Sequence, residues 1–313
     1  MNQETDCKTA LVTGGAGFIG SHIVDGMVAK GYRVLVLDNL SSGRRENLNS
    51  AAELRILDIR SDEAAELIQT ERPDIIFHLA AQMDVRRSTE DPAYDASVNV
   101  LGTLNLLTAA VKADTRQFIF ASTGGAIYGE QDVHPAPEGH PERPVSPYGV
   151  SKLAGERYMY YFHVQYGLDV TCMRFANVYG ERQNPHGEAG VVAIFLKLLY
   201  DGKQPIINGD GMQTRDYIHV SDVVRANIAA IGCPGFNIFN VGTGIESTVV
   251  ELYDGIRSAA GSELQATHGP GKPGEQRRSS VDASKLRSEL SVPEPLALSE
   301  GLQRTADWFR DTT

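Results

Sequence analysis

A tyrosine and a lysine four positions apart are the residues best suited to proton-transfer chemistry in this sequence. Tyr148 and Lys152 would project from one face of a helix. A phenol is protonated at neutral pH, but a neighbouring ammonium favours the phenolate and lowers the phenol pKa towards the range of a general base. We therefore predict that Tyr148 is the acid–base group and that Lys152 tunes it.

Two hydroxyl residues, Ser122 and Thr123, end a predicted strand upstream of this pair. Either hydroxyl could hold the substrate oxygen or relay its proton. Such residues are also ordinary at strand ends, and Tyr–Lys pairs occur on many helices by chance. Their order in the chain favours a catalytic role, because they stand between a glycine-rich turn and Tyr148 with Lys152.

The glycine-rich turn predicts a dinucleotide cofactor. Gly14, Gly17 and Gly20 follow a β-branched run directly and open a helix, the arrangement in which a pyrophosphate sits on the helix N-terminus. Asp38 ends the second predicted strand, 18 residues beyond Gly20, where it would accept hydrogen bonds from ribose hydroxyls. Because this carboxylate would repel a 2′-phosphate, NAD is favoured over NADP. The positive nicotinamide ring would also favour the Tyr148 phenolate.

The first half of the chain alternates short apolar runs with amphipathic stretches, which predicts a doubly wound parallel sheet of the Rossmann type, covered by helices on both faces. We expect an NAD-binding domain at 1–180, rejoined by about 214–243, and a smaller α/β substrate-binding domain made mainly of 181–313. The expected strands are 8–13, 33–38, 54–57, 74–79, 117–122, 170–175, 205–208, 216–220 and 236–241, with a helix at 191–201.

Composition limits the possible partners. The net charge of −11 disfavours nucleic acid and anionic membranes, so an anionic ligand would need a local cationic cluster. No apolar segment is long enough to span a bilayer or resembles a secretion signal, which predicts a cytoplasmic protein without membrane association. The three cysteines lack the spacing of a disulfide framework or a metal site, and we expect no metal.

With these residues in place, the chain from about Lys8 to Trp308 resembles an extended short-chain dehydrogenase/reductase, and within that group the UDP-galactose (UDP-glucose) 4-epimerase family. Beyond the glycine turn and Tyr148 with Lys152, the resemblance rests on five segments, which are Asp38-Asn39-Leu40-Ser41-Ser42-Gly43, His78-Leu79-Ala80-Ala81-Gln82, Asn99-Val100-Leu101-Gly102-Thr103, Arg174-Phe175-Ala176-Asn177-Val178-Tyr179-Gly180 and Arg215-Asp216-Tyr217-Ile218-His219-Val220.

The resemblance implies a reaction on a UDP-hexose. Tyr148 would take the proton of the sugar 4-hydroxyl while C4 gives a hydride to NAD, and the resulting 4-keto sugar would turn before hydride and proton return. By position, Thr123 matches the family's catalytic hydroxyl, although Ser122 stays open because the following loop is one residue longer than in some members. His78 receives no chemical role.

The resemblance also assigns binding residues. The cofactor set is Gly14, Gly17, Phe18, Ile19, Gly20, Asp38, Asn39, Ser42, Gly43, Asp58, Ile59, Leu79, Ala80, Ala81, Gln82 and Asn99, with Tyr148 and Lys152. The substrate set is Thr123, Tyr148, Asn177, Val191, Val192, Arg215, Tyr217, Lys272, Arg278 and Ser279.

Departures from the family pattern refine the reaction. Gly124 and Gly125 stand where dehydratases carry an Asp-Glu pair, which disfavours dehydration, and related decarboxylases use a Glu there. Lys272 replaces the usual Arg and loses a bidentate fork, so Arg278 is the stronger candidate for the diphosphate. Ser279 stands at the pocket-size gate, where its small side chain would admit a 2-acetamido group.

Quaternary structure and two rival functions stay open at this level. The helices around Pro92–Lys112 and after Tyr148 are unusually apolar, and relatives pair them in a four-helix bundle, which implies a homodimer. Epimerisation of a UDP-uronate, or another sugar-nucleotide oxidoreduction, is the enzymatic alternative. A non-catalytic NAD-sensing protein is the alternative from another class, although such a protein could lose the Tyr, Lys or hydroxyl that this chain retains.

Overall fold

The computed structural model describes residues 8–186, 190–271 and 276–312. The contacts between Cα atoms divide the chain into two compact units. Unit 1 comprises the described residues of Met1–Ser122 together with Ser146–Met173 and Asn227–Ile238. Unit 2 comprises Thr123–Val145, Arg174–Ala226 and the described residues of Phe239–Thr313.

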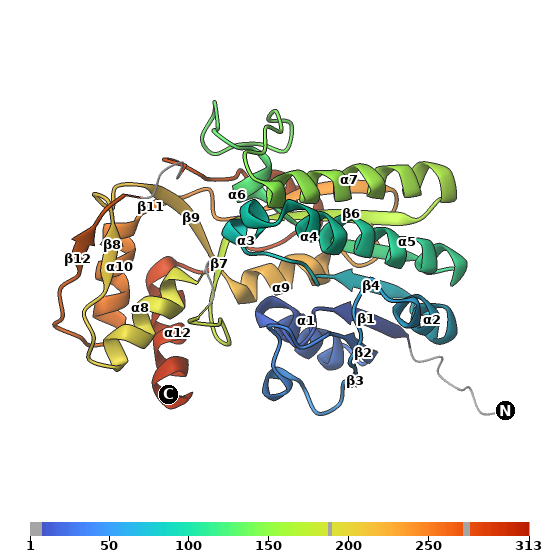
Figure 1. Cartoon of the computed structure of the whole chain (residues 1–313), viewed down its shortest axis with the longest axis horizontal. Helices are drawn as coiled ribbons and strands as arrows, with labels where there is room; N and C mark the ends of the chain where they lie inside the picture. Colours follow the sequence, from blue (N-terminus) through green and yellow to red (C-terminus); the bar gives the residue numbers. More distant parts are fainter. Residues whose placement is uncertain (1–7, 187–189, 272–275, 313) are drawn as a thin grey trace. The chain divides into compact units, whose positions relative to one another are not determined.

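The largest sheet has seven strands in the order β10-β6-β5-β4-β1-β2-β3. Each pair whose register is described, namely β1–β2, β2–β3, β1–β4 and β4–β5, is parallel. The order reverses at β1, so the crevice beyond the carboxyl ends of β1 and β4 is the ligand site expected of a Rossmann-type sheet. The strands are β1 (Thr9–Thr13), β2 (Arg33–Leu37), β3 (Glu53–Arg55), β4 (Ile75–His78), β5 (Gln117–Thr123), β6 (Asp169–Phe175) and β10 (Phe236–Val241) (Figure 1).

The helices of unit 1 lie in the connections between its parallel strands. One helix packs on β1 and β2, and three others pack side by side through apolar faces. Short helices and a π-helical turn lie between the second and the third of the four long helices along the chain. In order, they are α1 (Phe18–Ala29), η1 (Arg45–Asn47), α2 (Asp62–Glu71), α3 (Val85–Glu90), α4 (Pro92–Ala96), η2 (Ser97–Gly102), α5 (Thr103–Lys112) and α7 (Pro147–Tyr166).

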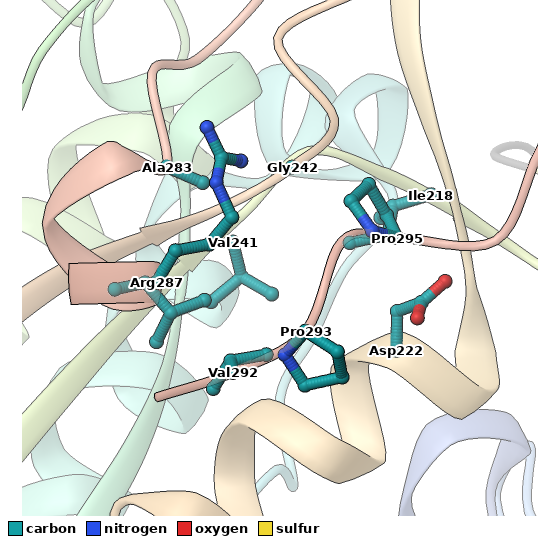
Figure 2. Close-up of a pocket in the computed structure, with 10 residues that line it drawn as sticks. Ile218, Asp222, Val241, Gly242, Ala283, Arg287, Val292, Pro293 and Pro295 are labelled. Carbon is teal, nitrogen blue, oxygen red and sulfur yellow. The ribbon is translucent and has the colours of Figure 1, made fainter. Parts of the chain in front are cut away.

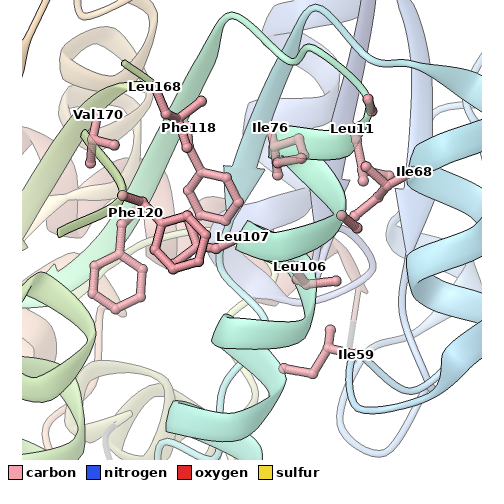
Figure 3. Close-up of a cluster of buried hydrophobic side chains, with 14 of the residues drawn as sticks. Leu11, Ile59, Ile68, Ile76, Leu106, Leu107, Phe118, Phe120, Leu168 and Val170 are labelled. Carbon is pink, nitrogen blue, oxygen red and sulfur yellow. The ribbon is translucent and has the colours of Figure 1, made fainter. Parts of the chain in front are cut away.

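The core of unit 1 lies between the sheet and the helices α2, α5 and α7. Phe118 and Phe120 of β5 are fully buried there, with Leu106 and Leu107 of α5 and Met159 of α7. Figure 3 shows the two phenylalanine rings side by side with the leucines of α5. This packing fixes β5 and α7, the two elements that carry the predicted proton-transfer residues.

Unit 2 contains a three-stranded sheet in the order β11-β9-β7 and a two-stranded sheet of β12 and β8. Its core is formed mainly by one face each of α8, α10 and α12. The elements are α6 (Gly124–Ile127), β7 (Asn177–Tyr179), α8 (Val191–Tyr200), β8 (Ile206–Asn208), β9 (Thr214–His219), β11 (Glu246–Thr248), α10 (Val249–Ala259), β12 (Thr267–Gly269), α11 (Ser284–Leu290) and α12 (Leu298–Thr312). The helix α9 (Val220–Ala229) begins in unit 2 and ends in unit 1.

The strands expected from the sequence are present, with ends that differ by one or two residues. The third strand, β3, ends at Arg55 rather than at residue 57, and Asp38 lies just beyond β2 rather than at its end. The sequence did not predict β7, β11 or β12, because each has only three residues and such a run shows no periodicity.

The two units use boundaries that differ from the expected domains. Thr123–Val145 belongs to unit 2, although the first domain was expected to run to residue 180. The chain rejoins unit 1 only over Asn227–Ile238, a shorter return than 214–243. The assignment of NAD to one domain and of the substrate to the other stays a prediction.

Candidate active site

The glycine turn connects β1 to α1 through very close backbone contacts. Gly14 has a φ of +67°, and a Cβ there would lie 2.7 Å from the backbone N of Ala80. A Cβ on Gly20 would lie 2.1 Å from the carbonyl oxygen of Gly14. Gly17 is the N-cap of α1 and offers no side chain to its first N–H groups, which suits them to an anion. Phe18 and Ile19 form the first turn of α1.

Asp38, the residue after β2, supports this turn through hydrogen bonds. Its carboxylate is 7% exposed and accepts hydrogen bonds from the backbone N–H groups of Ala16, at 2.9 Å, and Leu40, at 2.8 Å. A Cβ on Gly43 would lie 2.9 Å from both carboxylate oxygens. Each oxygen has a second lone pair, so a role in holding ribose hydroxyls is compatible with the bracing role that the structure adds.

The neighbouring residues predicted to hold the cofactor have varied surroundings. Asn39 and Ser42 are exposed. The Asn39 amide donates to Asp58 at 3.3 Å, and the Arg60 guanidinium beside Asp58 lowers the pKa of that carboxyl to about 2. Ile59 is buried in the core of unit 1. Asp58 therefore stays ionised, with part of its hydrogen-bonding capacity already taken by Arg60.

Just after β4, buried polar side chains hold the backbone in place through hydrogen bonds. Gln82 and Asn99 form a reciprocal pair, in which the Gln82 N–H donates to Asn99 Oδ1 and Asn99 Nδ2 donates to the Gln82 carbonyl, both at 2.8 Å. Asn99 Nδ2 also lies 3.2 Å from Ser151 Oγ. The predicted cofactor residues Gln82 and Asn99 are thus brought together beside the residue that precedes Lys152, while Leu79, Ala80 and Ala81 link β4 to Gln82.

His78 has a structural explanation. Its ring nitrogens lie 2.7 Å from Thr13 Oγ1 and 2.9 Å from Thr103 Oγ1. Burial, with a smaller effect of Lys152, lowers the pKa of His78 to about 3, so the ring is neutral. These contacts account for His78 without a chemical role.

Tyr148 and Lys152 lie in the first turns of α7, which begins with Ser146 as N-cap and Pro147 at the first helical position. Lys152 is 3% exposed, and its Nζ donates to the Ala121 carbonyl at 2.9 Å. The Nζ also lies 4.8 Å from the Phe120 ring centroid and 5.9 Å from that of Tyr148. Burial lowers the pKa of Lys152 to about 8.

The pKa of Tyr148 differs from the sequence-based expectation. Burial and the negative charge of Asp95 raise the pKa of Tyr148, whereas a decrease was predicted from the neighbouring ammonium. The reason is that the Lys152 ammonium is directed to the Ala121 carbonyl and the phenol is desolvated. The prediction also counted the nicotinamide charge, which belongs to the cofactor and not to the chain.

Two buried carboxylates near Lys152 were missed by the sequence analysis. Asp95 is 1% exposed and accepts from Gln82 Nε2, at 3.1 Å, and Asn99 Nδ2, at 3.0 Å. Glu156 is also 1% exposed and lies one helical turn after Lys152. Both raise the pKa of Lys152. Asp95 stands four residues before Asn99, and Glu156 stands four residues after Lys152. This spacing could have indicated a contact on one helix face, but it fits a solvated helix face equally well.

The two candidate hydroxyls have different partners. Ser122 is 3% exposed and donates to Glu156 Oε1 at 2.6 Å. Thr123 Oγ1 accepts from the Ala126 N–H at 3.2 Å as the N-cap of α6. The Ser122 proton is therefore already used by a buried carboxylate, which leaves Thr123 as the better candidate for a substrate contact.

Gly124, the residue after Thr123, has little space for a side chain. A Cβ there would lie 2.6 Å from Val281 Cγ1. An aspartate at this position would require Val281 to move, which adds a packing reason to the predicted lack of dehydration chemistry.

In unit 2, the predicted substrate residues gather on β7, on β9 and in the segment around Ser279. Asn177 and Tyr217 are paired in register between β7 and β9. Arg215 donates to the Thr214 carbonyl at 2.7 Å. The Asp216 N–H donates to the Ser279 carbonyl at 3.0 Å, and Ser279 is 3% exposed. These residues therefore share one neighbourhood within unit 2.

Arg278 is bound to a carboxylate. Its guanidinium donates to Glu246 at 2.5 and 3.1 Å, and this contact lowers the pKa of Glu246 to about 2. A diphosphate would have to share or replace Glu246 as the partner. Lys272 lies outside the described residues.

Two of the predicted substrate residues, Val191 and Val192, lie in the first turn of α8. Val192 is 1% exposed and belongs to the core of unit 2, and Val191 packs against that core. Because the Val192 side chain is committed to the core, a substrate contact there would have to come from its backbone.

A small cavity in unit 2 contains none of the predicted site residues. Ile218, Asp222, Val241 and Arg287 are among its lining residues (Figure 2). Asp222 accepts from the Leu296 N–H at 3.0 Å, which explains that carboxylate as an anchor for the chain. Over the described residues, no cluster of His, Cys, Asp or Glu suits a metal ion, and no helix is long and apolar enough to cross a membrane.

Comparison with known proteins identifies relatives over nearly the whole chain. Residues 10–242 match the model of the NAD dependent epimerase/dehydratase family. The chain is 45% identical over 307 residues to a UDP-glucose 4-epimerase of Mycolicibacterium smegmatis, covering 96% of this chain and 98% of that protein.

Two solved structures are also similar. A Thermotoga maritima UDP-glucose 4-epimerase with UDP-glucose has a TM-score of 0.95 and 46% identity, covering 97% of this chain and 99% of that one. A Thermus thermophilus UDP-glucose 4-epimerase in complex with NAD has a TM-score of 0.93 and 42% identity, covering 97% of this chain and 100% of that one.

The glycine turn generates a first prediction. Gly20→Ala places a methyl group against the Gly14 carbonyl and should push the turn out of its pyrophosphate-binding shape. We expect NAD affinity to fall by about tenfold or more, or ~1.4 kcal/mol. The measurement is the NAD released on denaturing the purified protein, followed by titration of the stripped protein.

Gly139→Ala is the matched control, since a Cβ at that position meets no atom within 4 Å. It should bind NAD like the unaltered chain. Equal NAD binding by the Gly20→Ala and Gly139→Ala proteins would contradict the role assigned to the turn.

Proposed function

This chain belongs to the NAD dependent epimerase/dehydratase family, and from that premise we propose that it catalyses NAD-dependent 4-epimerisation of a UDP-hexose. UDP-glucose and UDP-galactose are the proposed pair. The observation that carries the proposal is the buried Lys152, held on the Ala121 carbonyl one helical turn after Tyr148. This arrangement places a phenol and an ammonium at the end of a Rossmann-type sheet whose glycine turn suits a dinucleotide.

In the proposed reaction, Tyr148 acts as the phenolate, which the Lys152 ammonium and the positive nicotinamide ring of bound NAD would favour, and this phenolate accepts the proton of the sugar 4-hydroxyl. NAD, held by the glycine turn and Asp38, would supply reversible hydride-transfer chemistry at C4 of the sugar. Tyr148 then gives the proton back to the same oxygen, so that the reaction has no net redox change. Lys152 stabilises the phenolate electrostatically, and Thr123 holds the reacting oxygen through its hydroxyl.

The nucleotide would be held by residues of unit 2. Arg215 and Arg278 supply cations for the diphosphate, and Asn177 and Tyr217 supply polar groups on neighbouring strands. This local positive charge would offset the net charge of −11, which otherwise repels an anionic substrate. A cytoplasmic location is part of the proposal and rests on the sequence alone.

The proposed reaction predicts epimer formation without added NAD. Purified protein is incubated separately with UDP-galactose, UDP-N-acetylgalactosamine and UDP-glucuronate, and the products are separated by chromatography. We expect UDP-glucose from UDP-galactose. Product from UDP-glucuronate alone would instead support the uronate alternative, and bound NAD with no conversion of any sugar would support an NAD-sensing protein.

Tyr148→Phe should lower kcat by about 10²–10⁴-fold, because the variant loses the proton acceptor, and should retain NAD. Tyr166→Phe is the control, since Tyr166 is 51% exposed at the last residue of the same helix. If Tyr148→Phe kept full activity, Tyr148 would not be the acid–base group.

We also propose that the pocket accepts the N-acetylated pair. Ser279 is small, and its carbonyl is fixed by the Asp216 N–H. Ser279→Tyr should lower kcat/KM for UDP-N-acetylgalactosamine by about tenfold or more while changing kcat/KM for UDP-galactose less. Ser279→Ala serves as the control that keeps the position small. An equal loss on both substrates would exclude Ser279 as the size gate.

We propose a homodimer that pairs α5 and α7 with their copies in a second subunit. The support is the exposure of apolar side chains on and beside these helices, since Leu101 is 61%, Val164 65% and Tyr161 49% exposed. Sedimentation at micromolar concentration should show a dimer. Val164→Glu should shift it towards monomer, whereas Val133→Glu, at a 56% exposed position in unit 2, should not. A monomeric unaltered chain would contradict the proposal.

A further inference from the structure

Two side chains of α7 bind two consecutive residues of β5. Lys152 Nζ donates to the Ala121 carbonyl at 2.9 Å, and Glu156 Oε1 accepts from Ser122 Oγ at 2.6 Å. Lys152 and Glu156 are one helical turn apart and therefore point from the same face of the helix. Lys152, Glu156 and Ser122 are each at most 3% exposed. These two hydrogen bonds therefore connect α7 to the end of β5 and are buried between the helix and the strand.

The backbone of α7 comes unusually close to β5 between these two contacts. A Cβ on Gly155 would lie 2.7 Å from Phe120 Cζ, so this position has no room for a larger side chain unless the ring moves. Phe120 immediately precedes Ala121, and its ring lies 4.8 Å from Lys152 Nζ. The close approach makes a hydrogen bond of 2.6 Å possible for a side chain as short as Ser122.

A buried ammonium requires nearby negative charge, because its desolvation favours the neutral amine. The charged or titratable groups around Lys152 are Asp95, which precedes η2, Glu156 and Tyr148 on α7, and His78 on β4. His78 is neutral and Tyr148 is protonated in the chain alone. The two carboxylates therefore supply the compensating charge, and Glu156 is the one that also binds the strand.

We propose that Glu156 is a positioning residue, whose buried carboxylate fixes Ser122 at the end of β5 and keeps the Lys152 side chain charged and directed to Ala121. This inference rests on the proposed function, because it concerns the group that tunes Tyr148. Glu156 does not touch the substrate. It acts through Lys152 and through the strand end that leads, in the next residue, to Thr123.

The consequence is a specific effect on the pH profile. Loss of the Glu156 charge should lower the pKa of Lys152 from about 8, and the amine would lose its proton at a lower pH. The alkaline limb of the kcat profile reports this ionisation in the enzyme–substrate complex. Asp95, which also raises the pKa of Lys152, is unaltered in such a variant, so the shift should be partial.

The experiment measures the kcat and KM of Glu156→Gln for UDP-galactose between pH 5.5 and about 10, a range that spans the Lys152 ionisation, with products separated chromatographically. We expect the alkaline limb to move down by about one pH unit. KM should change less than kcat. The proposal would be overturned by an unshifted alkaline limb in a folded Glu156→Gln protein. A lower melting temperature alone would indicate a merely structural role and would also overturn it.

Two further variants make the test decisive. Glu156→Asp keeps the charge but shortens the side chain, so kcat should fall by about tenfold, through loss of the Ser122 contact, with the alkaline limb in place. If Glu156→Gln does not fold, an unchanged kcat in Glu156→Asp overturns the proposal. Glu66→Gln, the same change at an exposed position of α2, should leave both limbs unchanged.

An inactive unaltered protein would contradict the proposed function rather than this inference. In that event, Glu156 is tested through Lys152 itself. The pKa of the Lys152 amine, followed by NMR of protein with isotopically labelled lysine, should be lower in Glu156→Gln than in the unaltered chain, and equal values would overturn the inference.

Discussion

The burial of a single ammonium group is the constraint around which unit 1 arranges its polar residues. Lys152 is 3% exposed, and removing such a cation from water costs several kcal/mol unless other groups compensate. The Ala121 carbonyl, the Phe120 ring and the carboxylates of Asp95 and Glu156 all contribute to that compensation. Each of these groups therefore offsets part of the cost of burying Lys152.

The arrangement also explains why the neighbouring polar residues form a connected network. Asp95 accepts from the side-chain amides of Asn99 and Gln82, and the Asn99 amide also binds the Gln82 backbone at its N–H and its carbonyl. Asn99 lies in the π-helical turn η2, an irregularity common at functional sites. Because buried polar groups must find partners, the same contacts that neutralise the Lys152 charge also hold the loop after β4 near the cofactor turn.

The sequence was sufficient to predict the elements with clear periodicity and the residues whose role depends on the backbone geometry of their own segment. Buried strands such as β1 and β5 read as apolar runs, and the glycine turn is constrained by its own backbone geometry. Asp95 and Glu156 could not be placed in the same way. A carboxylate four residues from a polar partner usually lies on a solvated helix face, and its burial depends on packing between elements far apart in sequence.

The sequence was likewise insufficient to predict pKa values. Opposite charges close in sequence suggested a low pKa for Tyr148, but a pKa depends on the direction in which the ammonium points and on desolvation. In the structure Lys152 points to Ala121, and burial dominates the Tyr148 pKa. The sequence therefore selected the candidate groups, whereas the direction of the Tyr148 pKa shift required three-dimensional information.

Unit 2 uses a buried carboxylate for a comparable purpose. Asp216 is 1% exposed and accepts from the N–H groups of Thr243, Gly244 and Val281. Its pKa is raised by burial, which these hydrogen bonds oppose. Since side chains alternate along a strand, Asp216 lies on one face of β9, and Arg215 and Tyr217 lie on the other, where Tyr217 is 7% exposed and belongs to the core of unit 2.

The Asp216 anchor therefore determines which way the proposed nucleotide contacts can point. Gly242 leaves the necessary space, because a Cβ there would lie 2.5 Å from Asp216 Oδ2. A substitution that turned Asp216 to the other face of β9 would also turn the side chains of Arg215 and Tyr217 to the opposite face. In both units, a buried acidic side chain orients residues that are proposed to meet the ligand.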